Sequence, residues 1–139
     1  MALTSSWTVA ALNGEGTVAS SICVVERRVT VGNRKLDIAG VGNVFALPPW
    51  RKTGLVDRVM TFTLEEAGRR GYDAGLLFCL PVLEKVYARM GWKKVEADVV
   101  MRDESGVCVP LPSKNITMAI PISLKAFPGG DIDIMGRDW

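Results

Sequence analysis

Apolar and polar residues alternate along the first third of the chain, the pattern of β-strands with one buried face. Asn-Gly at 13–14 and Gly-Asn at 32–33 interrupt the alternation, and both pairs favour tight turns between antiparallel strands. Gly-Val-Gly-Asn at 40–43 predicts a β-bulge or the close approach of another group to the backbone. The pattern predicts an antiparallel meander with strands at residues 7–12, 17–25, 29–31 and 36–47.

Residues 54–70 change to the 3.6-residue period of an amphipathic helix, and Gly71 is suited to end it. The apolar face is expected to carry Leu55, Val56, Val59, Met60, Phe62, Leu64 and Ala67. Two pairs on the polar side have the spacing of helical ion pairs, Glu65 with Arg69 and Glu66 with Arg70.

An unbroken apolar run at residues 74–80 predicts a central strand covered on both faces. A second helix is expected at 82–90, with Pro81 in its first turn and Gly91 beyond its end. Further strands are expected at 95–102 and 115–120, followed by a short tail.

The element order predicts a mixed sheet of the α/β (α+β) class in a single domain, residues 1–139. A strand, a helix and a strand in succession form a parallel crossover over residues 38–80. Ligands of such units bind beyond the carboxyl ends of the strands, where residues 46–56 lie.

The composition of the chain excludes several kinds of catalytic and metal-binding site. The chain has 139 residues and no histidine, so histidine-dependent triads, histidine metal sites and imidazole bases are excluded, and no metal site is expected. Three dispersed cysteines favour reduced thiols, and the chain shows neither a signal peptide nor a membrane span, so a cytoplasmic protein is expected. No basic stripe with interleaved aromatic residues favours nucleic-acid binding.

Charge is distributed unevenly. Residues 1–94 carry 13 Lys and Arg against 8 Asp and Glu, whereas residues 95–139 carry 4 against 7. A basic front and an acidic tail could serve an anionic cofactor and a cationic substrate, or could be chance clustering on a solvated surface.

The stretch Ala-Leu-Pro-Pro-Trp-Arg-Lys-Thr-Gly-Leu-Val at 46–56 places cations directly before a helix start. The first N–H groups of a helix have no partner inside it, so a phosphate placed there gains several hydrogen bonds. Gly54 would let a ligand approach the backbone, and Arg51 and Lys52 would add positive charge. The alternative is a turn that needs a glycine and happens to be basic.

The same stretch resembles the acetyl-CoA signature of the GNAT superfamily of N-acetyltransferases: an apolar strand, then Arg/Gln-x-x-Gly-x-Gly/Ala opening a helix. Val56 occupies the last position of this signature, where the superfamily has Gly or Ala. Tyr87-x-x-x-Gly91-Trp92 follows at the expected distance. Within the superfamily, the aminoglycoside 2′-N-acetyltransferases are the most similar. They share Trp-Arg, the valine at 56, the Ile-Pro-Ile-like run at 119–122 and an acidic tail ending in Trp.

The resemblance implies a GNAT-like fold and an acetyl-CoA-dependent N-acetyltransferase acting on a primary amine of a small molecule, without a metal. Backbone groups of Val44 and Ala46 would align the pantetheine and the acetyl carbonyl. The residues that would cradle the pyrophosphate are Arg51, Lys52, Thr53, Gly54, Leu55 and Val56. Tyr87 would protonate the departing thiolate, although it could equally be a core residue.

Amine acetylation also needs a base, and the strand before the acetyl site holds no acid at 40–43. Glu26 and Asp37 are the nearest acids in sequence. Residues that could hold a cationic amine and relay its proton through water are Asp131, Asp133, Asp138 and the carboxylate of Trp139, the alternative being a solvated tail. Cys79 is expected to be a buried, inert thiol.

Typical members of the superfamily begin with another strand and one or two helices before the segment that here starts at Trp7. Those helices normally wall the acceptor side, so the resemblance implies an N-terminally truncated fold. The expected consequences are an open acceptor side, a second chain covering it in a homodimer, or a non-catalytic protein that binds CoA or cationic ligands.

Overall fold

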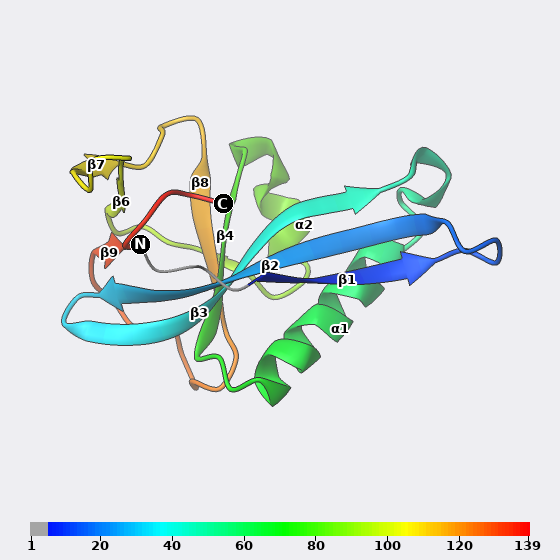
Figure 1. Ribbon diagram of the computed structural model, residues 1–139, viewed down its shortest axis with the longest axis horizontal. Coiled ribbons are helices and arrows are strands. Elements are labelled where there is room, and N and C mark those ends of the chain that lie inside the picture. Colours follow the sequence, from blue (N-terminus) through cyan, green and yellow to red (C-terminus); the bar gives the residue numbers. More distant parts are fainter. Residues whose placement is uncertain (1–5) are drawn as a thin grey trace.

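One curled mixed sheet with two helices on one of its faces forms the framework of the protein (Figure 1). The computed structural model describes residues 6–139. The strands follow one another across the sheet in the order β5-β8-β4-β3-β2-β9-β6-β7, and β1 pairs with β2. The predicted mixed α/β fold, with β3 and β4 parallel beside an antiparallel meander, is confirmed. A second parallel pair, β6 with β9, was not predicted.

Three long strands make the meander: β1 (Ser6–Leu12), β2 (Val18–Val31) and β3 (Arg34–Ala46). The prediction of two strands at 17–25 and 29–31 is wrong, because β2 continues through the charged residues between them. Glu26 and Arg28 project from the sheet as exposed side chains while their backbones keep pairing with Ala39 and Asp37. Charge alone therefore does not end a strand whose main chain is paired on both sides of the charged stretch.

The predicted bulge and the predicted close approach both occur in β3. Ser21 pairs with Phe45 and Cys23 with Gly42, so one residue of β2 lies opposite two residues of β3. Asn43 adopts a left-handed φ of 48°, a conformation that asparagine tolerates better than most residues. The ring of Trp139 packs against Gly40, where a Cβ would lie 2.6 Å from its Cε2 atom.

Helix α1 (Leu55–Arg69) connects β3 to β4 (Ala74–Cys79), and β4 runs parallel to β3 from Ile38 to Val41. Gly71 beyond its end has a φ of 84°, as expected for a helix stop. The prediction for the apolar face is wrong at Phe62, which is 54% exposed. Thr63 is buried instead, because its hydroxyl donates to the Val59 carbonyl (2.7 Å) and leaves its methyl group to pack.

The polar side of α1 differs from the prediction in one ion pair. Both Arg69 and Arg70 bind Glu66, at 3.0 and 3.1 Å, so the Glu66–Arg70 pair is confirmed and Arg69 does not pair with Glu65. Arg69 also lies 5.9 Å from the centre of the exposed Phe62 ring.

The second half of the chain departs further from the prediction. The second helix is short: η2 (Pro81–Leu83) is a 3₁₀ turn that leads into α2 (Glu84–Ala88), and Gly91 follows with φ 99°. Of the expected strand at 95–102 only the second half forms, as β6 (Val99–Arg102), and a two-residue strand, β5 (Lys93–Lys94), precedes the predicted range. Strand β8 (Ile116–Pro121) matches its prediction within one residue, and two strands were not predicted, β7 (Cys108–Pro110) and β9 (Ile132–Asp133).

Buried side chains form one cluster on each face of the sheet. The cluster on the helix side joins α1 and α2 to β2, β3 and β4 through residues such as Val24, Val41, Met60 and Tyr87. The opposite cluster is covered by β6, β9 and the C-terminal tail, and contains Leu36, Ile38 and Leu76. The tail thus occupies the face of the sheet that carries no helix among residues 6–139.

Candidate functional site

Strands β3 and β4 part at the bulge. Their pairing ends at Val41 and Leu77, although β3 continues to Ala46 and β4 to Cys79. In Figure 1 the end of β4 rises toward the top of the view, while β3 turns away to the right. Among the described residues, the stretch from Gly42 to Ala46 pairs with no strand other than β2, so its other edge is uncovered. A ligand can bind the main-chain groups there that have no partner, which excludes the Ala46 carbonyl because it accepts from Arg51.

The turn after β3 holds the predicted anion-binding residues. The 3₁₀ turn η1 (Pro48–Trp50) directs the chain from β3 to α1, and the Thr53 hydroxyl donates to the Trp50 carbonyl (2.5 Å). Arg51 folds back toward β3, and its Nε donates to the Ala46 carbonyl (3.2 Å). The turn is therefore fixed at its start by two proline residues and in its middle by two side-chain hydrogen bonds.

Gly54 immediately precedes α1 and has a φ of 84°, a left-handed value that favours glycine. No atom lies within 4 Å of the position where a Cβ would stand, so the backbone at this point faces open space. The first N–H groups of α1 have no carbonyl acceptor earlier in the helix. Lys52 is also exposed and left-handed, with φ 60°. The structure thus brings together free N–H groups and cations, as an anion site requires.

Tyr87 lies on α2, 9% exposed, within the helix-side cluster that contains the end of β4. Burial raises the pKa of its hydroxyl above the ordinary value, and the neighbouring Cys79 adds to the increase. Cys79 itself is 7% exposed, and burial together with Glu84 raises the pKa of its thiol. Both groups are therefore held protonated at neutral pH, a state that suits Tyr87 as a proton donor and Cys79 as an inert thiol.

Trp139 lies on the other face of the sheet, beside the point where β3 and β4 part. Its ring packs on Gly40 and against Phe78 (centroids 4.7 Å apart), and its Nε1 donates to the Leu76 carbonyl (3.3 Å). Its main-chain carbonyl carbon is 3.7 Å from the position of a Cβ on Gly42. The end of the tail is thus adjacent to the unpaired stretch of β3.

Arg27 binds this tail, a contact that the sequence did not predict. Its guanidinium donates to the carbonyls of Ile134 (3.1 Å) and Arg137 (3.0 Å) and lies 5.4 Å from the centre of the Trp139 ring. Partial burial lowers its pKa. Arg27 and its acceptors are more than one hundred residues apart in the chain, so no local pattern could have revealed the contact.

The structure does not bring the remaining predicted acids to the same place. Asp37 precedes Val44 by seven residues on β3, about 23 Å along an extended strand, and pairs with Arg28 (2.9 Å). Glu26 lies opposite Ala39 on the outer part of the helix-side face. Asp131 and Asp133 lie near the hairpin between β2 and β3, where β9 pairs with Thr30 and Val31. Trp139, by contrast, reaches the unpaired stretch of β3, and Asp138 directly precedes it in the tail.

Two further properties concern residues 6–139 alone. They contain no helix long and apolar enough to cross a membrane. They also contain no group of three or more Cys, Asp or Glu side chains arranged to hold a metal ion.

Comparisons with known proteins agree with this geometry. The profile of the acetyltransferase (GNAT) domain matches residues 2–95. No curated protein sequence matches the chain. Among solved structures, a GNAT family N-acetyltransferase from Escherichia coli in complex with CoA superposes with a TM-score of 0.64 and 18% identity, over 90% of this chain and 64% of that one. The chain thus spans less than two thirds of that protein.

Two more structures share the fold at low identity. A GNAT acetyltransferase from Staphylococcus aureus has a TM-score of 0.59 and 10% identity, over 85% of this chain and 68% of that one. Nourseothricin acetyltransferase has a TM-score of 0.56 and 19% identity, over 84% of this chain and 65% of that one. Because the domain profile covers well over half of the chain and the strands part beside the start of α1 as described, the chain belongs to the GNAT acetyltransferase family.

Proposed function

We propose that the protein is an acetyl-CoA-dependent N-acetyltransferase that acts on a primary amine of a small cationic molecule. The observation that carries this proposal is the separation of β3 from β4 after Val41, on the strand that leads through one turn to the open, left-handed Gly54 at the start of α1. An extended thioester can pair with the free edge of β3 while its pyrophosphate meets the first turn of the helix.

In this proposal the cofactor is bound mainly by the backbone. The main-chain groups of Val44 and the N–H group of Ala46 align the pantetheine arm and the acetyl carbonyl, and the N–H groups of residues 52–56 surround the pyrophosphate. The Ala46 carbonyl and the Arg51 N–H are already paired, with the Arg51 side chain and the Pro48 carbonyl. Arg51 and Lys52 contribute positive charge at the same turn. Because backbone groups make most of these contacts, the site depends on φ values and on the absence of side chains at Gly54.

Tyr87 is proposed as the general acid. The neutral amine attacks the thioester carbon and a carbon–nitrogen bond forms. The carbon–sulfur bond breaks as the Tyr87 hydroxyl gives its proton to the departing sulfur. The proton released from the nitrogen passes to solvent, from which the Tyr87 phenolate is protonated again. A phenol with its ordinary pKa of about 10 is protonated at neutral pH, and burial raises the pKa of Tyr87 further. The hydroxyl is therefore in the protonated form that a general acid needs.

The acceptor is proposed to bind on the face covered by the tail, next to Trp139. The motifs shared with aminoglycoside 2′-N-acetyltransferases make aminoglycosides the first acceptors to test. Two copies of the chain could also associate through β1, which pairs on one side only among the described residues. Sedimentation velocity measures that association.

The experiment combines cofactor binding with turnover. Saturating CoA should raise the melting temperature, since a ligand at one hundred times its Kd stabilises the native state by about 2.7 kcal/mol. Gly54→Asp should abolish the shift, whereas Gly54→Ala, which shares the backbone strain but adds no charge, should retain part of it. Equal CoA shifts in these two variants would contradict the assignment of the turn.

Turnover separates an enzyme from a binding protein. Wild type should release CoA from acetyl-CoA in the presence of an amine panel that includes aminoglycosides, and Tyr87→Phe should slow this release by about 10²-fold, in line with loss of a general acid. A CoA-dependent thermal shift without turnover on any amine would favour the non-catalytic alternative.

A further inference from the structure

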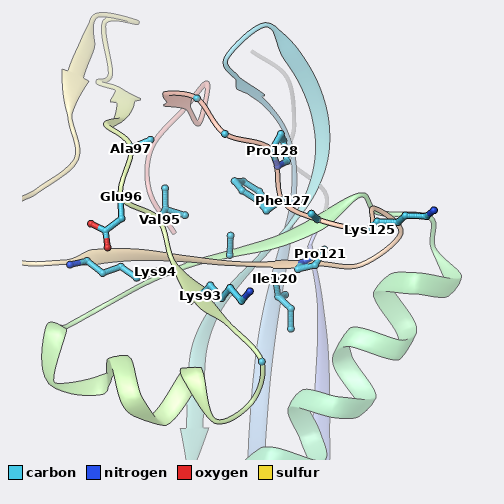
Figure 2. Close-up of a pocket in the computed structure, with 15 residues that line it drawn as sticks. Lys93, Lys94, Val95, Glu96, Ala97, Ile120, Pro121, Lys125, Phe127 and Pro128 are labelled. Atoms are coloured by element: carbon cyan, nitrogen blue, oxygen red, sulfur yellow. The ribbon is translucent and has the colours of Figure 1, made fainter.

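A pocket of about 570 Å³ lies away from the parting of β3 and β4, at the other end of β4. It is bounded on one side by the segment 93–97, on the second by residues 119–121 of β8, and on the third by the loop 125–130 (Figure 2). Ala119 and Pro121 pair with Leu76 and Ala74 at the start of β4. The pocket therefore lies outside the proposed cofactor and acceptor positions.

The walls of this pocket are mostly apolar. Val95 and Phe127 face each other across it (Figure 2), and both pack with Ala119 in the cluster on the face of the sheet that the tail covers. The size falls within the range of pockets that hold small organic ligands, which are also largely apolar with a few polar groups for orientation.

Positive charge dominates its rim, where three lysines face a single glutamate. Figure 2 shows Lys94 extending toward the carboxylate of Glu96, and Lys125 extending outward at the opposite rim. Lys93 pairs with Ala119 across β5 and β8, so its side chain lies on the same face of the sheet as Ala119, Val95 and Phe127. Among residues 6–139, none of these three ammonium groups lies within 4.0 Å of a carboxylate. Lys93 is thus a cation on the lining of an apolar pocket, with no partner of opposite charge among residues 6–139.

The loop that closes the pocket is fixed at both ends. At its start, the N–H groups of Ile122, Ser123 and Leu124 all donate to the Asp73 carbonyl, at 3.0 to 3.3 Å. At its end, the Gly32 N–H donates to the Asp131 carbonyl (2.9 Å). Gly130 packs closely on Gly32, since a Cβ added to Gly130 would lie 2.8 Å from the Gly32 Cα. The pocket walls are thus held in place without a ligand, which lowers the cost of binding one.

We propose that this pocket is a second ligand site, which binds a small amphipathic carboxylate with its apolar body between Val95 and Phe127 and its carboxylate at Lys93. An ammonium group binds a carboxylate as a point charge, so the charged head can take several orientations while the walls fix the apolar body. This site does not depend on the proposed transferase activity.

Calorimetric titration of the full chain with octanoate tests the proposal. Wild type should bind octanoate, and Lys93→Met should weaken binding about fivefold, the effect of losing one partly exposed ion pair. Lys114→Met, an exposed lysine outside the pocket, should bind as wild type does. Phe127→Ala should weaken the binding of octanoate and of uncharged octan-1-ol alike.

Binding of uncharged octan-1-ol distinguishes the contribution of the carboxylate charge from that of the apolar body. It should bind wild type about fivefold more weakly than octanoate and should bind Lys93→Met and wild type equally. No binding of octanoate to wild type, equal affinity for the two ligands, or equal losses in Lys93→Met and Lys114→Met would each overturn the proposal. Circular dichroism of each variant confirms that these differences do not come from unfolding.

Discussion

Tyr87 links the candidate chemistry to the stability of the core at the scale of a single residue. Burial raises the pKa of its hydroxyl in the folded protein, whereas the unfolded chain has the ordinary value of about 10. The neutral phenol therefore stabilises the fold fully below the unfolded value, and this contribution is lost as pH rises through the folded pKa.

Tyr87→Phe should remove this alkaline loss. We expect the free energy of unfolding of wild type to fall more steeply above pH 10 than that of the variant. Between pH 7 and 9 the two free energies should change with pH in the same way. Urea unfolding at pH 7 to 11 measures the difference. Identical slopes above pH 10 would mean that the hydroxyl is not shielded by the core.

Gly40 is the residue on which the position of Trp139 depends. An added methyl group would lie 2.6 Å from the indole Cε2, so the ring must move and give up its hydrogen bond to the Leu76 carbonyl. Gly40→Ala should lower the free energy of unfolding by about 1–3 kcal/mol, as overpacking does, and should shift tryptophan emission to longer wavelength.

Gly14→Ala is the matched control for this substitution. Gly14 lies in an exposed turn with no atom within 4 Å of a Cβ position, so its replacement should leave the emission spectrum unchanged. An unchanged spectrum in Gly40→Ala as well would contradict the packing of Trp139 on β3.

At the scale of elements, β9 is attached to β6 by a charged pair. Asp133 accepts hydrogen bonds from Arg102, at 2.5 and 3.4 Å, and from the Met135 N–H, at 2.9 Å. The Arg102 contact, aided by the Met135 N–H, lowers the pKa of Asp133. A carboxylate with a lowered pKa stabilises the fold above its unfolded value of about 3.9, and this contribution is lost as pH falls through the folded pKa.

Asp133→Asn should therefore weaken the dependence of stability on pH between pH 5 and 2. Asp37→Asn is the comparison, because the Asp37–Arg28 pair is more exposed and such pairs contribute little. Thermal unfolding across this range measures both variants. A flatter profile in Asp37→Asn than in Asp133→Asn would contradict this assignment.

The elements that the sequence predicts well are those whose signals are local. Helix α1, strand β4 and the bulge at Asn43 follow from periodicity, apolar runs and glycine spacing. Strands β7 and β9 have two or three residues and exist because β6 pairs with them, which no local pattern encodes. The same holds for the site: the turn at 51–54 is visible in the sequence, but the Arg27 contacts with the tail arise only after folding.

For the whole molecule, the proposed cofactor position and the lysine-rimmed pocket lie at opposite ends of β4. Hydrogen exchange with saturating CoA should therefore protect the amides of residues 44–58 and leave those of residues 125–131 unchanged. Octanoate should give the reverse pattern. Protection of both regions by either ligand would show that the two ends are coupled or that one site takes both ligands.

The single extra residue at the bulge also changes which face of the sheet the following side chains of β3 point to. In a regular strand, residues 41 and 44 point to opposite faces, yet Val41 and Val44 both pack into the helix-side cluster. Every side chain of β3 beyond Asn43 has therefore exchanged faces relative to an uninterrupted strand. A one-residue deletion at this point, unlike most substitutions, would return Phe45 and Ala46 to the other parity and rejoin the ladder that the bulge interrupts.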